Sequence, residues 1–238
     1  MTYDFVLQYS ERRLPHEDLE VNTPEGSEAP KFTREFQRDF DDLLRWRRDV
    51  RHFDTAAIDT EVLDRLLDAA CMAPSVGNAQ PWRFVSVDDA ANRAAIAANF
   101  TKANSDALAG YSGDRAQRYA GLKLAGLHDA PHQFAVFCDS RTKQGHGLGR
   151  STMPEMLQYS AVLAVHTFWL QARAHGIGVG WVSILDPEAV TRQLAVPDEW
   201  KLVAYLCIGR PLHESATPEL ERRGWQSRST DCRRVLQR

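Results

Sequence analysis

The chain has 238 residues, which is enough to bury one core and few for two independent domains. Hydrophobic residues make up 43% of the chain, charged residues make up 26%, and the formal net charge is −3. Neither composition nor charge therefore favours nucleic acid or an anionic membrane as a partner. We expect a single domain that acts on a small molecule.

Cysteine usage and apolar runs predict the compartment. The four cysteines form no C-x-x-C pair, and the N-terminal residues lack the basic region and apolar core of a secretory signal. The longest strongly apolar stretch, 161–170, is shorter than the ~20 residues that a membrane span needs. We expect a soluble cytoplasmic protein with reduced cysteines and no membrane partner.

The first third of the chain predicts an extension followed by a helix, a helix and a strand. Residues 1–35 carry prolines and glycine among many charges, which is typical of irregular structure. Apolar residues at helical spacing predict a helix over 35–47, followed by an irregular basic segment at 48–53. A second amphipathic helix is marked by residues 62–70, and 82–87 alternates like a strand.

The middle of the chain predicts helices around a buried strand. Residues 88–130 favour helices that break near 110–113, and a strand follows at 134–138. The run 156–174 is apolar on nearly every side, which predicts a central buried helix with His166 as a hydrogen-bonded core residue.

Two further strands, at 179–185 and 202–208, contain few polar residues, so we expect a sheet covered on both faces. The predicted fold class is α+β, with the main domain at 36–211. Residues 212–238 are polar around Trp225 and predict a C-terminal arm, which either packs on its own domain or reaches a neighbouring subunit.

The first chemical motif is Arg47-Arg48-Asp49-Val50-Arg51. Three guanidiniums are suited to a phosphate, although a solvated charge cluster at a helix C-terminus explains the same pattern. A carboxylate among three cations is expected to have a lowered pKa, which suits a general base if Asp49 also faces a substrate.

The second motif is the loop 73–82, in which small residues and two prolines present Ser75, Asn78 and Gln80. Amide side chains supply both the donor and the acceptor that the edge of a heterocycle requires. The alternative interpretation is a polar turn that joins a helix to a strand.

The third motif is the glycine-rich run 176–185. A dinucleotide-binding loop follows a strand and opens a helix, whereas these glycines close a helix and open a strand, so we reject an NAD-binding loop here. The glycines are suited to ending the helix and letting backbone approach a flat ligand. Ser183 is then expected on a strand, facing either the core or a ligand.

These three motifs, in this order, resemble the nitroreductase family over residues 36–211. Within that family the chain is similar to the 5,6-dimethylbenzimidazole synthases, through the first two motifs and through the segments 122–126, 135–139, 147–155 and 178–185. Ordinary nitroreductases tend to have a small residue in place of Asp49 and lack the segment around Ser183, so these two residues discriminate between the groups.

The resemblance implies a nitroreductase-like FMN-binding fold, in which helices flank a central mixed or antiparallel sheet. It implies an intertwined homodimer with FMN at the interface. The implied reaction is the oxygen-dependent fragmentation of reduced FMN to 5,6-dimethylbenzimidazole and erythrose 4-phosphate, for the lower ligand of cobalamin. FMN is then the substrate, dioxygen the co-substrate, and a separate flavin reductase supplies the reduced form.

The resemblance also implies the site residues. The implied phosphate and pyrimidine ligands are Arg47, Arg48 and Arg51; the implied ring contacts are Ser75, Asn78, Gln80, Gly180 and Trp181. Asp49 acts as a base or hydrogen-bond partner, and Ser183 orients the flavin. Arg210 either reaches the phosphate or is simply exposed. Residues 100–128 and 141–155 form a lid that excludes water.

Two other functions remain open at this point. An NAD(P)H-dependent nitroreductase or flavin reductase would retain FMN under an open face, and a flavin-binding or storage protein would leave FMN intact. A metal site is not expected. His128 and His132 have helical spacing, but Pro131 lies between them and no third ligand is evident.

Overall fold

The computed structural model describes residues 28–122 and 126–238. Most of the predicted extension, and residues 123–125 of the predicted lid, therefore lie outside the described residues. Helix α1 (Arg34–Trp46) begins one residue before the predicted end of the extension, because the Thr33 side chain accepts a hydrogen bond from the Phe36 amide at 3.1 Å. Among the described helices, none has the length and apolarity needed to cross a membrane.

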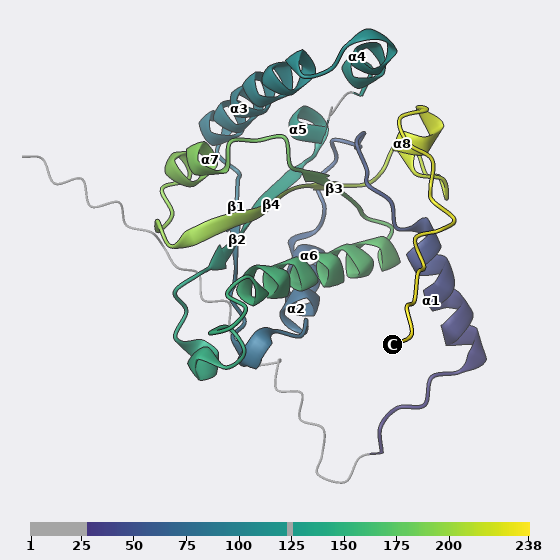
Figure 1. Ribbon diagram of the computed structural model, residues 1–238, viewed down its shortest axis with the longest axis vertical. Coiled ribbons are helices and arrows are strands. Elements are labelled where there is room, and N and C mark those ends of the chain that lie inside the picture. The colour runs from purple at the N-terminus through teal and green to yellow at the C-terminus, as the bar shows by residue number, and fades with distance from the viewer. Residues whose placement is uncertain (1–27, 123–125) are drawn as a thin grey trace, which may run out of the picture.

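The centre of the fold is an antiparallel sheet, as the α+β prediction expects (Figure 1). Its strand order is β1-β2-β4-β3, and each of the three neighbouring pairs runs antiparallel. The strands are β1 (Trp82–Ser86), β2 (His132–Asp139), β3 (Gly178–Val182) and β4 (Trp200–Gly209).

Helices lie on both sides of this sheet (Figure 1). One side carries α2 (Thr60–Cys71) and α6 (Met156–Ala174), and the other carries α3 (Ala90–Ala109), α5 (Gly126–Asp129) and α7 (Pro187–Gln193). Peripheral elements are α4 (Gly113–Ala120), α8 (Glu219–Arg222) and the 3-10 turns η2 (Val76–Asn78) and η3 (Gln144–Gly147).

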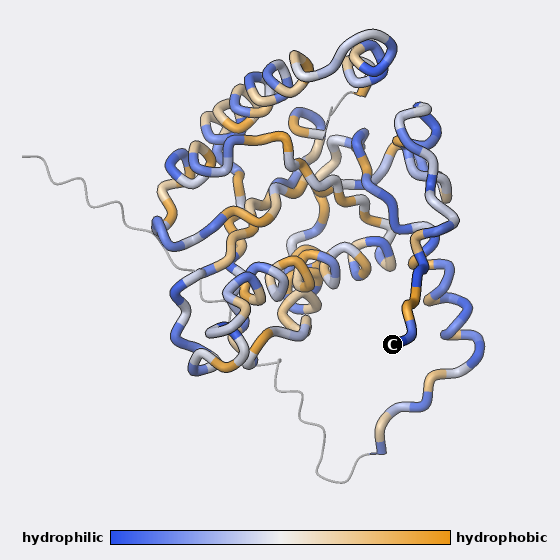
Figure 2. Tube along the Cα trace, in the orientation of Figure 1, coloured by the Kyte–Doolittle hydropathy of each residue, from blue (hydrophilic) through white to orange (hydrophobic). Residues whose placement is uncertain are grey.

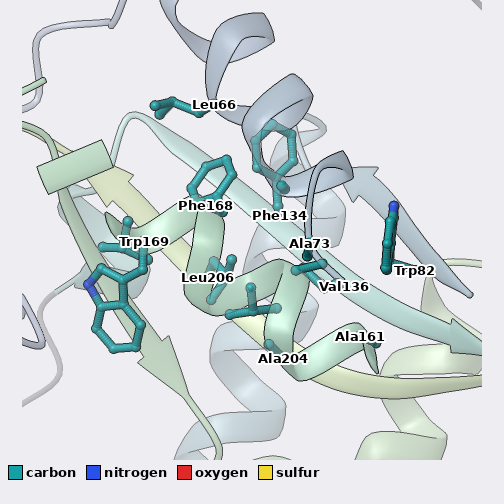
Figure 3. Close-up of a cluster of buried hydrophobic side chains, with 14 of the residues drawn as sticks. Leu66, Ala73, Trp82, Phe134, Val136, Ala161, Phe168, Trp169, Ala204 and Leu206 are labelled. Carbon is teal, nitrogen blue, oxygen red and sulfur yellow. The ribbon is translucent and has the colours of Figure 1, made fainter. Parts of the chain in front are cut away.

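Side-chain alternation along the central strands divides the core into two clusters. On β2, Phe134 and Val136 belong to the cluster beneath α2 and α6, whereas Ala135 and Phe137 belong to the cluster beneath α3, α5 and α7. Figure 3 shows the first cluster, with Phe134 close to Phe168 of α6. The prediction that the sheet is covered on both faces is confirmed.

The prediction that α6 is buried on nearly every side is wrong for the single chain. One face of α6 packs on the sheet and α2, but Tyr159, Val162 and Leu163 are exposed, and His166 lies on this exposed side rather than in the core. Helix α1 also buries no residue, and Phe36 and Phe40 are exposed one turn apart. Figure 2 shows apolar residues recurring along α6. The exposed fractions show that the described chain covers one apolar face of this helix and leaves the other uncovered.

The segment after α1 lies along the edge of the sheet. Asp49 forms a parallel bridge with Val179 of β3, and the Val50 amide donates to the Val179 carbonyl at 3.1 Å. Gly178 and Gly180 make this approach possible, because a Cβ on either residue would collide with Val50. The two glycines therefore place Asp49 beside β3.

We predict that Gly180→Ala destabilises the protein by about 1–3 kcal/mol, because the added Cβ meets the Val50 carbonyl oxygen. Urea unfolding of the flavin-free protein measures the change. Gly110→Ala is the matched control, since Gly110 has φ −78° and an added Cβ would lie 3.3 Å from the Ala107 carbonyl oxygen. Equal unfolding free energies for the two variants would contradict the assigned packing.

Candidate active site

A cavity of about 300 Å³ lies beside the C-terminal half of α6. Three parts of the chain form it: the segment after α1, the junction of α6 with β3, and the residues that follow β4. The charged residues of its lining include Arg47, Arg48, Asp49, Arg51, Arg173, Glu214, Glu219, Arg222 and Arg223. Cations therefore outnumber carboxylates, which suits a phosphate-bearing ligand.

Asp49 is held by two donors in this cavity. One carboxylate oxygen accepts from the Trp181 amide at 3.0 Å, and the other accepts from Arg51 Nε at 3.3 Å. The side chain keeps 37% of its exposure within the cavity, whereas Arg51 keeps 12%. The sequence thus brings together Asp49, Arg51 and Trp181 across 132 positions of the chain.

The pKa of Asp49 is raised from its ordinary value, chiefly because enclosure by the protein disfavours the charged form. The Trp181 amide and Arg51 oppose this rise, and the carboxylate of Glu219 adds to it. The prediction of a lowered pKa is therefore wrong. The three guanidiniums do not surround the carboxylate, and desolvation outweighs the one that contacts it.

Arg47 and Arg48 point to different partners. The guanidinium of Arg47 lies 4.7 Å from the centre of the Trp169 ring, and Trp169 packs beside Trp181 at 6.3 Å. Arg48 donates from Nε and Nη2 to the Ala216 carbonyl at 2.8 and 2.6 Å. Burial lowers the pKa of both guanidiniums.

The loop with Ser75, Asn78 and Gln80 is a second polar cluster. Ser75 Oγ accepts from the Gln80 amide at 3.1 Å, and Gln80 Nε2 donates to Asn78 Oδ1 at 3.3 Å. Asn78 and Gln80 have φ of 54° and 43°, which is costly for residues other than glycine. Backbone strain at Asn78 and Gln80, two residues apart, is typical of a functional loop.

The two clusters lie on opposite sides of α6. The loop is fastened to the N-terminal half of the helix, where Ser160 Oγ accepts from the Val76 amide at 3.0 Å, and Arg47 meets Trp169 nine residues later. Nine helical residues rise about 14 Å and make about two and a half turns, so the two side chains point in nearly opposite directions. One chain therefore does not bring the arginine cluster and the amide loop together.

Ser183 and Arg210 lie outside the cavity lining. The predicted strand 179–185 ends at Val182, and Ser183 is exposed immediately after it. The chain leaves the sheet here because Asp186 caps α7, accepting from the Glu188 and Ala189 amides at 3.0 and 3.1 Å. Arg210 is exposed, and its carbonyl accepts from the Asp54 amide at 2.9 Å.

Several cavity residues were not predicted. Arg173 lies in the last turn of α6 and pairs with Glu214, Glu219 and Arg222 belong to α8, and Arg223 follows directly after α8. The spacing of Arg173, one turn after Trp169, was a signal that places both on one helix face. No local pattern marks the α8 residues, because they reach the cavity through the path of the arm.

His132 serves the fold. Its Nε2 accepts from the Ile58 amide at 3.0 Å, and burial lowers its pKa. The acceptor nitrogen is therefore occupied by backbone. Within residues 28–122 and 126–238, no group of three His, Cys, Asp or Glu residues is arranged to hold a metal ion.

Comparison with known proteins agrees with the predicted resemblance. Residues 44–210 match the profile of the Nitroreductase family. The chain is 59% identical over 200 residues to the 5,6-dimethylbenzimidazole synthase of Rhodospirillum rubrum, covering 84% of this chain and 95% of that protein. It is 53% identical over 185 residues to a synthase of the same name from Rhodobacter capsulatus, with coverages of 78% and 89%.

A solved structure supports the fold. Oxidized iodotyrosine deiodinase, bound to FMN and 3-iodo-L-tyrosine, superposes with a TM-score of 0.64 at 23% identity, over 83% of this chain and 97% of that one. The antiparallel sheet with helices on both faces and the family match over 44–210 both support the same fold. The chain belongs to the nitroreductase family.

Proposed function

We propose that the protein is an aerobic 5,6-dimethylbenzimidazole synthase. In this proposal it converts reduced FMN and dioxygen to 5,6-dimethylbenzimidazole and erythrose 4-phosphate, for the lower ligand of cobalamin, and a separate reductase supplies reduced FMN. The observation that carries the proposal is Asp49, a carboxylate held by Trp181 and Arg51 inside a cationic cavity. Similarity to two curated synthases over most of the chain supports the same function.

The residues present fit FMN. Arg47 and Arg51 offer guanidinium donors to the phosphate and pyrimidine side of the flavin, and Asn78 and Gln80 offer amide groups to its isoalloxazine ring. Reduced FMN, when bound, supplies both the carbon skeleton and the electrons that dioxygen accepts. The protein's task is to bind it, orient it and exclude water.

A homodimer would complete the site. The arginine cluster and the amide loop lie on opposite sides of α6, and the exposed face of α6 between them carries Tyr159, Val162 and Leu163. A second copy docked on this apolar face would bring its own amide loop toward the arginine cluster. Each of two sites would then take residues from both subunits.

Asp49 and Ser183 are the proposed catalytic pair. A carboxyl whose pKa is raised above its ordinary value is better suited to exchange a proton than an ordinary carboxylate, and the Trp181 amide fixes its orientation. Ser183 follows Trp181 by two positions, and its exposed hydroxyl is available to hydrogen-bond the flavin. Arg210 remains a proposed phosphate contact from the neighbouring loop.

We predict that Asp49→Asn lowers benzimidazole formation at least about 100-fold, because the base is lost while the side-chain shape is kept. Protein is mixed with stoichiometric FMN, reduced without oxygen and exposed to air, and the products are analysed by chromatography and mass. Asp54→Asn is the control, since Asp54 is exposed and caps only the Ala56 amide. Intact FMN from the native protein, with NADPH consumed only when a nitroaromatic is added, would establish a nitroreductase instead.

The raised pKa of Asp49 predicts an effect on stability. In the unfolded chain the carboxyl titrates at its ordinary value, so its ionisation in the folded protein costs stability fully above the folded pKa. That cost disappears as the pH falls below the unfolded pKa. We expect Asp49→Asn to raise the unfolding free energy of the flavin-free protein at pH 7 and to have less effect near pH 4. A less stable variant at pH 7 would mean that the Arg51 and Trp181 contacts outweigh burial.

Subunit mixing tests the shared site. Arg51→Ala and Asn78→Ala are each expected to be inactive, but their coexpression should restore about a quarter of the native activity, because half of the dimers would carry one intact site of two. Coexpression of Arg51→Ala with Arg47→Ala is the control and should restore none. Sites built from a single chain would give no recovery with either pair.

A further inference from the structure

The first part of the C-terminal arm, residues 212–225, joins the cavity to α4. It leaves β4, lines one side of the cavity and passes through α8 (Figure 1). Two sets of contacts with its own chain fasten it, one near Ala216 and one at Trp225. The family resemblance implies that Arg48 binds the phosphate, and that role does not require either set of contacts.

In the first fastening, all three guanidinium nitrogens of Arg48 donate hydrogen bonds to backbone carbonyls. Nε and Nη2 both donate to the Ala216 carbonyl, at 2.8 and 2.6 Å, and Nη1 donates to the Arg47 carbonyl at 2.7 Å. A guanidinium binds phosphate through a pair of N–H groups on one edge. The Nε–Nη2 edge of Arg48 is one such pair, and the Ala216 carbonyl occupies it, so a phosphate bound at this edge would have to displace the arm.

The second fastening is an aromatic cluster beside α4, formed by Trp225 of the arm, Tyr119 of α4 and Tyr111, which precedes α4. Trp225 meets Tyr111 edge-on at 5.5 Å and Tyr119 at 6.0 Å, and the two tyrosine rings lie 4.9 Å apart. Arg118 of α4 also donates to the Gly224 carbonyl at 2.8 Å. Tyr119 is 8% exposed, so this contact covers one side of a helix in the predicted lid.

Between the fastenings, α8 presents charges to the cavity. Glu219 keeps 13% of its side-chain exposure and pairs with Arg223 at 3.4 Å. Both residues line the cavity that contains Asp49. The position of the arm therefore determines which charges surround Asp49.

We propose that Arg48 and Trp225 are positioning residues, which pin the arm at two points so that it holds α8 over the cavity and braces α4. Arg48 acts through the arm rather than on a phosphate, and this is a different role from that of Arg47 and Arg51. The proposal rests on the proposed function only for the identity of what the cavity binds. The mechanical link between Arg48 and α4 is a property of the flavin-free chain.

Hydrogen–deuterium exchange on the full-length, flavin-free protein tests this link. Trp225→Ala should accelerate amide exchange across α4, on the order of tenfold, because the helix loses its cover. Arg48→Ala should accelerate exchange in the same helix, although the hydrogen bonds of Arg48 within the described residues go to Arg47 and Ala216 and not to α4. The double variant should exceed the larger single effect by little, since both changes release one arm. Arg45→Ala and Leu236→Ala, at exposed positions beyond the two fastenings, should leave α4 unchanged.

Binding of oxidised FMN and riboflavin supplies the second readout. If Arg48 positions the arm, Arg48→Ala and Trp225→Ala should weaken both ligands by similar factors, whereas Arg51→Ala should weaken FMN selectively. Arg48→Lys replaces Arg48→Ala if the latter fails to fold, because lysine keeps the charge but lacks the two-pronged donor. Unchanged α4 exchange in the Arg48 variant, or a loss of FMN binding without loss of riboflavin binding, would overturn the proposal. Neither readout depends on benzimidazole formation, so the failure of the proposed reaction would be seen separately.

Discussion

The close approach of Val50 to Gly180 is the constraint on which the site depends. Two glycines on β3 let the backbone after α1 lie against the sheet edge, where Asp49 bridges Val179. The same approach puts the Asp49 carboxylate next to the Trp181 amide. Glycine therefore has a structural role here, since Val50 of the same chain occupies the space in which a side chain would lie.

Enclosure and charge have opposing effects on Asp49. The cavity is rich in guanidiniums, yet Arg47 turns to Trp169 and Arg48 to Ala216, which leaves Arg51 as the contacting cation. Desolvation therefore raises the pKa of the carboxyl. A buried carboxyl with a raised pKa lowers the stability of the folded protein and is better able to exchange protons, which is typical of catalytic sites.

Local patterns predicted much of the fold. The apolar run 156–174 coincides with the observed bounds of α6. The scarcity of polar residues at 179–185 and 202–208 predicted a sheet covered on both faces, and the two core clusters confirm it. The strand at β3 was predicted too long, because the cap that Asp186 provides for α7 was not recognised. The exposed face of α6 was missed, since apolarity alone does not distinguish a core from an uncovered surface.

The sequence predicted which residues belong to the site better than it predicted which residues they contact. Asp49 and Arg51 were recognised from a five-residue motif, but the Arg48 contact spans 168 positions and no local pattern encodes it. Arg173 and the α8 residues reach the cavity only through the fold. Sequence alone also gave no means to see that the arginine cluster and the amide loop flank opposite sides of α6, which is the basis for the proposed shared site.

The most direct measurement of the central claim is the stoichiometry of a single aerobic turnover by the native protein. Reduced FMN is supplied in an amount equal to the protein, air is admitted, and both the flavin remaining and the 5,6-dimethylbenzimidazole formed are quantified. The account predicts that the benzimidazole gained equals the FMN lost, mole for mole. Full recovery of intact FMN, whether with hydrogen peroxide or with a reduced acceptor, would contradict it.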